Sequence, residues 1–477
     1  MNTPSARLAI GLLAATGLVA TLRAADPERP LVSVRAPIIA LTHVRVFDAT
    51  SAEARENQTL VFDHGRIAQV GSAADISVPA GATTIDATGK TVIPGLVMVH
   101  EHLYYAVRVR NLGFHVNEME YSFPRLYLAC GLTTIRTGGS VEPYADMEVK
   151  RRIDAGEMPG PKIHLTAPYV EGPPSSITQL HAVSGPEDAI RLIDYWATQG
   201  FTSVKLYVHL TPAVAGPAIA EAHRLGMQVT GHIGAMTYRE AADLGIDNLE
   251  HGFFVANDFV RGKKENELPL PAVSQASIDQ LKLDAPELKA LYQHLIEKHV
   301  AITSTLAVFE GFVGGRPELS PPVLATMSEP ARVNYETYRA HINSLKSDLT
   351  PWFHKEMAME KGFADAGGLV VVGTDPTGGG NVVAGFGSLR AVELLVEAGF
   401  TPAQALTIAT RNGAKLLGVD HEVGTLETGK AADAILINGN PLKSIGDIRK
   451  IETVFKDGVG YDSRTLINST RGCVGVE

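Results

Sequence analysis

The length and composition of the chain indicate a folded protein of more than one domain. It has 477 residues, of which 45% are hydrophobic and 20% are charged, a balance that argues against a disordered or fibrous protein and against a membrane-spanning body. The net charge of -10 leaves no basic excess to neutralise a phosphate backbone, so a nucleic-acid partner is not expected.

The first 25 residues have the pattern of a secretory signal peptide. Arg7 precedes an apolar run over residues 8–22, and the small residues Ala24 and Ala25 follow it. The alternative is an uncleaved membrane anchor, but the run is shorter than the roughly 20 apolar residues that a spanning helix needs. We therefore expect an exported protein, periplasmic or secreted, with no stable membrane span once residues 1–25 are removed.

Short runs of β-branched residues towards both ends of the chain predict a small β domain. Turn residues such as glycine, asparagine and proline separate the runs. The runs lie at residues 38–41, 44–47, 59–62, 66–70 and 83–85, and again at 434–437 and 451–455. We expect the two sets to pair, which would build a composite β-sandwich from residues 37–92 and 420–468.

Between these ends, short apolar strands alternate with helical segments. The strands are expected at residues 93–99, 132–136, 162–166, 203–207, 228–231, 248–250, 301–305 and 369–373. Eight strand–helix units are the count of a (β/α)8 TIM barrel, so we predict the α/β class and a barrel over residues 93–419. The connections at 257–298 and 309–367 exceed one helical return and are expected to hold extra helices.

Polar residues directly after these strands form a candidate active site, because such barrels carry their catalytic residues at the C-terminal strand ends. The first strand leads into His100 and His102, which point to the same side by strand alternation and can share a metal ion. Single candidates follow the fourth, fifth, sixth and eighth strands, namely Lys205, His232, His251 and Asp375.

The residue types in this set suit a catalytic divalent metal site. Neutral imidazoles and a carboxylate are ligands of zinc and similar ions. Lys205 cannot ligate as an ammonium, because that group has no lone pair to offer; carboxylation of its nitrogen would turn it into a bridging anion. The alternative is an unmodified Lys205 that acts electrostatically beside a single ion.

The order His-x-His, Lys, His, His, Asp at these strand ends resembles the amidohydrolase superfamily. Two further segments are similar to that superfamily. Residues 92–96 (Val-Ile-Pro-Gly-Leu) resemble the segment that leads into its barrel, and residues 424–433 (Gly-Thr-Leu-Glu-Thr-Gly-Lys-Ala-Ala-Asp) resemble the segment that returns from the barrel to its small β domain. Within it, the chain looks most like the imidazolonepropionase-like and prolidase-like branch. One departure is Met98, at a position where the family often has an aspartate.

The resemblance implies two divalent ions, with zinc expected. His100, His102 and Asp375 would hold one ion, His232 and His251 the other, and carboxylated Lys205 would bridge them. Asp375 is the expected general base for a metal-activated hydroxide. The predicted reaction is hydrolysis of a C–N amide or peptide bond in a dipeptide, an N-acyl amino acid or a related small amide.

Other activities of the superfamily stay open as alternatives. They are deamination at a mononuclear centre and hydrolysis of a cyclic amide or an ester. A non-catalytic assembly protein is a further alternative, although the presence of all six residues argues against it. The sequence is compatible with a homo-oligomer.

Four further residues are candidate substrate contacts. Tyr207 shares the strand face of Lys205 by alternation, with core packing as its alternative role. Arg136 ends the second strand and is a candidate for a substrate carboxylate or for an internal ion pair. His181 and His209 closely follow the third and fourth strands.

Overall fold

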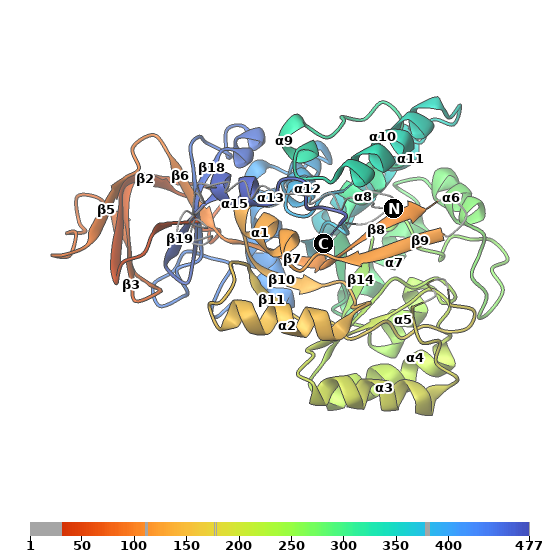
Figure 1. The fold of residues 1–477 in the computed structure, drawn as a ribbon. Helices are drawn as coiled ribbons and strands as arrows, with labels where there is room; N and C mark the ends of the chain where they lie inside the picture. The colour runs from red at the N-terminus through yellow and green to blue at the C-terminus, as the bar shows by residue number, and fades with distance from the viewer. Residues whose placement is uncertain (1–30, 110–112, 176, 178, 377–381, 477) are drawn as a thin grey trace, which may run out of the picture.

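The computed structural model describes residues 31–109, 113–175, 177, 179–376 and 382–476. Strands from the two ends of the sequence lie together on one side of the molecule, and parallel strands wrapped by helices lie on the other (Figure 1). None of the helices in these ranges is long and apolar enough to cross a membrane. The predicted signal peptide at residues 1–25 lies outside the described residues.

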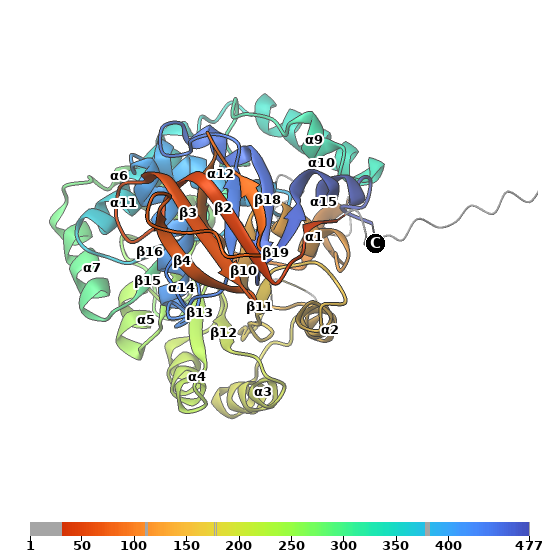
Figure 2. The ribbon, with the colours of Figure 1, turned by 90° about the vertical axis from the view of Figure 1, so that its left-hand side faces the viewer.

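Strands from both chain ends form one sheet, which faces the viewer in Figure 2. Within the described residues it has nine strands in the order β1-β19-β18-β17-β6-β2-β3-β4, with β5 beside β2. Their bounds are β1 (Val32–Val34), β2 (Ile38–Val46), β3 (Arg55–Asp63), β4 (Arg66–Ser72), β5 (Thr83–Asp86), β6 (Thr91–Pro94), β17 (Ala434–Ile437), β18 (Ile451–Lys456) and β19 (Val459–Asp462).

The two sets of strands meet at the antiparallel pair β6–β17, where Ile93 lies opposite Ile435. Apolar side chains such as Leu41, Phe62 and Phe455 are buried in a core of their own, separate from that of the barrel. The predicted pairing of the two chain ends is therefore confirmed. A sandwich of two facing sheets stays a prediction, because all nine described strands are linked in one sheet; the domain boundaries stay predictions as well.

The central segment contributes eight parallel strands within the described residues, each overlapping a predicted one. A three-stranded sheet contains β7 (Leu96–Glu101), β10 (Leu132–Thr137) and β11 (Lys162–His164), and a five-stranded sheet contains β12 (Ser203–Leu206), β13 (Gln228–Gly231), β14 (Asn248–Glu250), β15 (Ala301–Ser304) and β16 (Val370–Val372). These strands run in chain order, as in a TIM-barrel fold, and the α/β class is as predicted.

The two sheets approach each other at both seams without a continuous ladder. At one seam, isolated parallel bridges join Thr166 to Ser203 and Val170 to Leu206. At the other, the main-chain N–H groups of Thr374 and Asp375 both donate to the carbonyl oxygen of His100, each at 3.0 Å. The second seam therefore brings the segment after β16 directly against the end of β7.

Helices pack outside the strands, as the amphipathic α3 (Pro186–Thr198) illustrates. It buries Ala189, Ile193 and Trp196, which recur at three- and four-residue spacing along one face. The other return helices are α1 (Ser122–Ala129), α2 (Pro143–Asp154), α4 (Pro212–Arg224), α5 (Tyr238–Leu244), α12 (Phe386–Glu397), α13 (Pro402–Thr407), a π-helical turn (Ile408–Asn412) and α14 (Gly413–Leu416). A 3-10 turn (Ile445–Arg449) and α15 (Ser463–Ser469) flank the last strands.

The two long connections contain the extra helices that the sequence predicted. The first holds α6 (Pro271–Gln280) and α7 (Pro286–Glu297). The second begins at the end of α8 (Leu306–Glu310) and holds α9 (Pro321–Leu324), α10 (Glu329–Ser344) and α11 (Thr350–Asp365). An antiparallel hairpin of β8 (Tyr104–Val109) and β9 (Gly113–Glu118) follows the His-x-His segment and was not predicted. Tyr104, Ala106 and Val116 of this hairpin line the cavity at the strand ends where the candidate site lies.

Candidate metal centre

All six predicted metal-site residues line one cavity of about 260 Å³ at the C-terminal strand ends. His100 lies in β7 and Lys205 in β12, whereas His102, His232 and His251 each come one residue after their strand and Asp375 comes three residues after β16. His100, His102, Lys205 and His251 are all 3% exposed or less. The sequence order therefore predicted correctly that these side chains come together.

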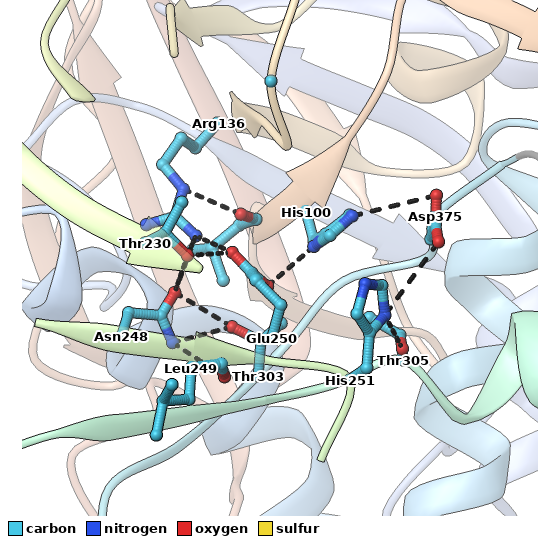
Figure 3. Close-up of polar contacts among 12 residues, drawn as sticks. His100, Arg136, Thr230, Asn248, Leu249, Glu250, His251, Thr303, Thr305 and Asp375 are labelled. Carbon is cyan, nitrogen blue, oxygen red and sulfur yellow. Dashed lines mark hydrogen bonds and ion pairs between the residues drawn. The ribbon is translucent and has the colours of Figure 1, made fainter. Parts of the chain in front are cut away.

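Asp375 faces three of the four imidazoles. Its Oδ1 lies 3.2 Å from His102 Nε2 and 3.8 Å from His100 Nε2, and its Oδ2 lies 4.0 Å from His251 Nδ1. Figure 3 shows Asp375 across from His100 and His251. One ligand atom each from His100, His251 and Asp375 lies within 4.8 Å of the other two. This cluster takes residues from both of the predicted ion-binding sets.

The backbone at two of these positions lies in the left-handed region, with φ of +69° at His251 and +51° at Asp375. Residues with a Cβ rarely adopt this conformation, and where they do the strain is concentrated at functional sites. Glycines next to the cluster also allow close contact. A Cβ on Gly138 would lie 2.6 Å from His100 Cδ2 and 3.0 Å from His102 Cε1.

The imidazoles are held in place through hydrogen bonds of their Nδ1 atoms. Nδ1 of His100 lies 2.6 Å from Glu250 Oε2, and Nδ1 of His102 lies 3.2 Å from the carbonyl oxygen of Gly139. When these Nδ1 atoms carry the hydrogen, the Nε2 lone pairs point towards Asp375. Such a carboxylate or carbonyl partner behind the ring is typical of metal-binding histidines.

Glu250 is a residue of the site that the sequence reasoning missed. Its Oε1 accepts a hydrogen bond from Arg136 Nη2 at 2.8 Å, while its Oε2 bonds to His100 (Figure 3). Burial alone would raise the pKa of Glu250, but His100, Lys205 and Arg136 hold it well below its usual range. The available signal was strand alternation, which puts Glu250 on the inner face of β14 with Asn248.

This ion pair is the second of the two roles that the sequence left open for Arg136, in place of a contact with a substrate carboxylate. The Arg136 side chain is fully buried, does not line the cavity, and donates to Val99 O at 2.9 Å and to Asn248 Oδ1 at 2.7 Å. A guanidinium buried this deeply needs an internal carboxylate, and Glu250 supplies it. Met98, on the neighbouring part of β7, is fully buried in the hydrophobic core.

Burial sets the protonation state of the ligand candidates. It lowers the pKa of His232 to about 3 and lowers the pKa of His102 and of His251 below the ordinary histidine value. Burial also lowers the pKa of Lys205 to about 8. Neutral imidazoles, the form that ligates metals, are therefore favoured at neutral pH.

The remaining predicted substrate contacts divide into one that lines the cavity and two that do not. Tyr207 lines it, with its ring centroid 5.3 Å from that of His232. His181 is exposed and pairs with Asp188 at 3.0 Å, and His209 lies against Glu171 at 3.3 Å. Neither of these two histidines lines the cavity, and a substrate contact by either of them stays a prediction.

Two further tyrosines in the cavity wall were also missed. The hydroxyls of Tyr104 and Tyr169 are 2.7 Å apart, and the Tyr104 ring lies 4.4 Å from the His102 ring, centroid to centroid. Tyr104 is two residues beyond His102, so strand alternation beyond the His-x-His segment was the available signal. Apolar side chains complete the wall, among them Val116, Val141 and Ile177.

The fold and the site together define a barrel protein with a candidate metal centre at its C-terminal strand ends. Residues 91–460 match the Amidohydrolase family. The chain belongs to this family, which confirms the predicted superfamily and, at the level of the family, the prediction of a metal-dependent amidohydrolase.

Individual relatives agree with the predicted branch. An imidazolonepropionase of Geobacillus sp. (strain WCH70) is 23% identical over 442 residues, which cover 88% of this chain and 92% of that protein. A dihydroorotase of Pelotomaculum thermopropionicum is 33% identical over 101 residues, about a fifth of either protein (21% and 21%). A solved Bifidobacterium longum protein assigned as a prolidase is 25% identical with a TM-score of 0.62, covering 92% of this chain and 100% of its own.

Proposed function

We propose that this protein hydrolyses a C–N bond in a small amide, such as a dipeptide or an N-acyl amino acid. The observation that carries the proposal is the cluster of His100, His251 and Asp375, two of them buried and one half-buried, whose ligand atoms lie within 4.8 Å of one another. His102, His232 and Lys205 line the same cavity. The family match supports this reaction class.

The residues present fit a divalent ion. The donor set of imidazoles and one carboxylate is that of zinc and similar ions, and burial keeps His102, His232 and His251 in the neutral form. The Nδ1 bond from His100 to Glu250 leaves Nε2 free to ligate. His100, His102 and Asp375 would hold one ion, and His232 and His251 a second, with zinc as the expected metal.

Lys205 is the proposed bridge between two ions, as its carbamate. Its amine is buried and lines the cavity, and burial lowers its pKa to about 8, which increases the fraction of neutral amine that can add CO2. The reaction forms a nitrogen–carbon bond and releases one proton. The product is an anion in place of an ammonium that could not ligate.

The chemistry that a divalent ion supplies at this site is Lewis-acid activation of water and of a carbonyl group. Asp375 is the proposed proton carrier. Burial alone would raise its pKa, but His102 and His100 hold it well below the ordinary value, so it is ionised and able to accept a proton. It would take the proton from the attacking water and return it to the leaving nitrogen. Tyr104 and Tyr207 line the cavity wall and would orient the substrate.

A cyclic amide is the second candidate substrate class. The likeness to an imidazolonepropionase extends over 92% of that relative, and opening a cyclic amide needs the same water activation and the same proton transfer to nitrogen. A panel of dipeptides, N-acyl amino acids and lactams would separate the two classes by their kcat/KM values.

The test is Asp375→Asn, compared with Asp365→Asn, which changes an exposed carboxylate paired with Lys361 on α11. Loss of the proton carrier is expected to lower kcat by about 10²- to 10⁴-fold, whereas the control keeps parent activity. Metal content and thermal unfolding of both variants establish that the fold is intact. Parent-like hydrolysis by a folded Asp375→Asn protein would refute this role.

We also propose that the protein is exported through residues 1–25. The support is the sequence pattern alone. N-terminal sequencing of protein recovered from the periplasm or the medium would show cleavage near Ala25, and recovery of full-length protein from the cytoplasm alone would refute the proposal.

A further inference from the structure

A second cavity, of about 350 Å³, lies between α8, α10 and the start of α12. It shares no lining residue with the metal-site cavity. Its walls combine apolar side chains, such as Val323 and Phe386, with a buried arginine, Arg339 of α10.

Arg339 is 4% exposed and has only neutral hydrogen-bond partners in the described part of the chain. Nη1 donates to Gly311 O at 2.9 Å, Nη2 donates to Arg316 O at 3.2 Å, and Nε has no partner. No carboxylate of the described residues lies within ion-pair distance of the guanidinium. Arg339 therefore combines an uncompensated buried charge with an unused donor, and each is costly in a protein interior.

Six other charged side chains around this cavity, two of them exposed, compensate one another. Arg316 bonds to Glu310 and Glu397, Arg390 bonds to Glu310, Glu393 and Glu397, and Arg449 bonds to Glu393. With these three cations and three anions paired, Arg339 is the buried charge of the wall that has no counter-ion among the described residues. Glu318, also on the wall, is exposed and forms no ion pair among the described residues.

We propose that this cavity binds a small monocarboxylate with an apolar body, whose carboxylate pairs with Arg339. A guanidinium offers planar N–H donors that match the two oxygens of a carboxylate. Tyr335 provides a further donor, because its hydroxyl oxygen accepts the Leu319 N–H at 2.8 Å and keeps its own hydrogen. The walls at Val323, Val383 and Phe386 suit an aliphatic or aromatic body. One buried cation without a counter-ion matches a monoanion.

Benzoate is a suitable probe, and benzyl alcohol is its neutral counterpart. Calorimetric titrations use the full protein as purified and again after chelation, because a carboxylate held by the metal centre would lose its affinity on metal removal. We expect benzoate to bind under both conditions and benzyl alcohol to bind at least about tenfold more weakly, since it lacks the charge-assisted bond.

Three variants locate the binding. Arg339→Met is expected to weaken benzoate binding by about 10- to 100-fold, whereas Arg332→Met removes an exposed arginine of the same helix, paired with Glu336, and leaves binding unchanged. Val323→Phe fills the cavity, keeps the guanidinium and is also expected to abolish binding. It decides the outcome if Arg339→Met fails to fold. A soak with 4-bromobenzoate should give an anomalous peak beside Arg339.

Three results would overturn the proposal. The first is that the parent protein does not bind benzoate at millimolar concentrations. The second is that chelation removes benzoate binding, whereas Arg339→Met and Val323→Phe leave it intact. The third is equal affinity for benzoate and benzyl alcohol. None of these results bears on amide hydrolysis, which the Asp375→Asn measurement tests separately.

Discussion

Glu250→Gln removes the carboxylate that joins Arg136 to His100, and two separate losses are expected. Removing one partner of a buried ion pair costs about 3–5 kcal/mol. The glutamine oxygen can keep a hydrogen bond to the guanidinium worth about 1.5–3 kcal/mol, so the net destabilisation should be about 1–3 kcal/mol. His100 also loses the anion that fixes its tautomer, which is expected to weaken metal binding by about 10- to 100-fold.

The two losses are measured on the same proteins. Thermal unfolding after chelation reports stability without the metal, and competition with an indicator chelator reports metal affinity. Glu148→Gln is the control, because Glu148 forms an exposed pair with Arg151, and such pairs contribute at most about 1 kcal/mol.

A double variant separates the ion pair from the metal effect. Adding Arg136→Met to Glu250→Gln removes the unpaired charge, so stability should recover while metal affinity stays low. The reasoning would fail if Glu250→Gln bound metal as tightly as the parent protein. It would also fail if the double variant were less stable than Glu250→Gln alone.

Other perturbations have equally definite expected outcomes. Chelation should abolish hydrolysis and lower the unfolding temperature, and added zinc should restore both. A metal at a free concentration of about 1,000 times its Kd contributes about 4 kcal/mol to the free energy of unfolding. Gly138→Ala would bring its Cβ to 2.6 Å from His100 Cδ2, so activity and metal affinity should both fall, whereas Gly446→Ala, with no atom within 4 Å of the added Cβ, should change neither. Burial raises the pKa of Glu360 to about 8, so the contribution of its protonated carboxyl group to stability is present at low pH and is lost as pH rises through that value. Between about pH 6 and about pH 9, the unfolding temperature should therefore fall less for Glu360→Gln than for the parent protein. Tyr104→Phe should lower kcat/KM and cost about 0.5–1.5 kcal/mol for the bond to Tyr169, and an unchanged kcat/KM would remove Tyr104 from the proposed substrate contacts.

The sequence predicted the barrel strands and the ligand candidates well because both depend on local patterns. Each apolar run is followed by its polar residue, and the period of two in a strand places His100 and His102 on one side. The order of the strands then brings distant candidates such as Lys205 and Asp375 to the same end of the barrel. No long-range contact had to be known in advance.

The sequence could not predict the contacts that depend on distant partners. Whether Arg136 turns into the cavity or into the barrel interior is decided by Glu250, more than a hundred residues later. The β8–β9 hairpin interrupts the strand–helix alternation, so the place of Tyr104 in the cavity wall depends on an insertion that the barrel pattern does not contain. His181 and His209 followed their strands closely, but acidic neighbours hold them outside the cavity.

The β6–β17 pairing has a consequence for biosynthesis. Thr91 and Gly439, which are 348 positions apart, are hydrogen-bonded to each other at this junction. During translation the edge of β6 that pairs with β17 therefore stays unpaired until the whole barrel has been synthesised. An unpaired strand edge is a template for association with other chains. Because β7 and its histidines follow β6 directly, β17, which is translated late, completes the support of His100 and His102, which are translated early. A chaperone that shields this edge on the nascent chain would protect the yield of active protein.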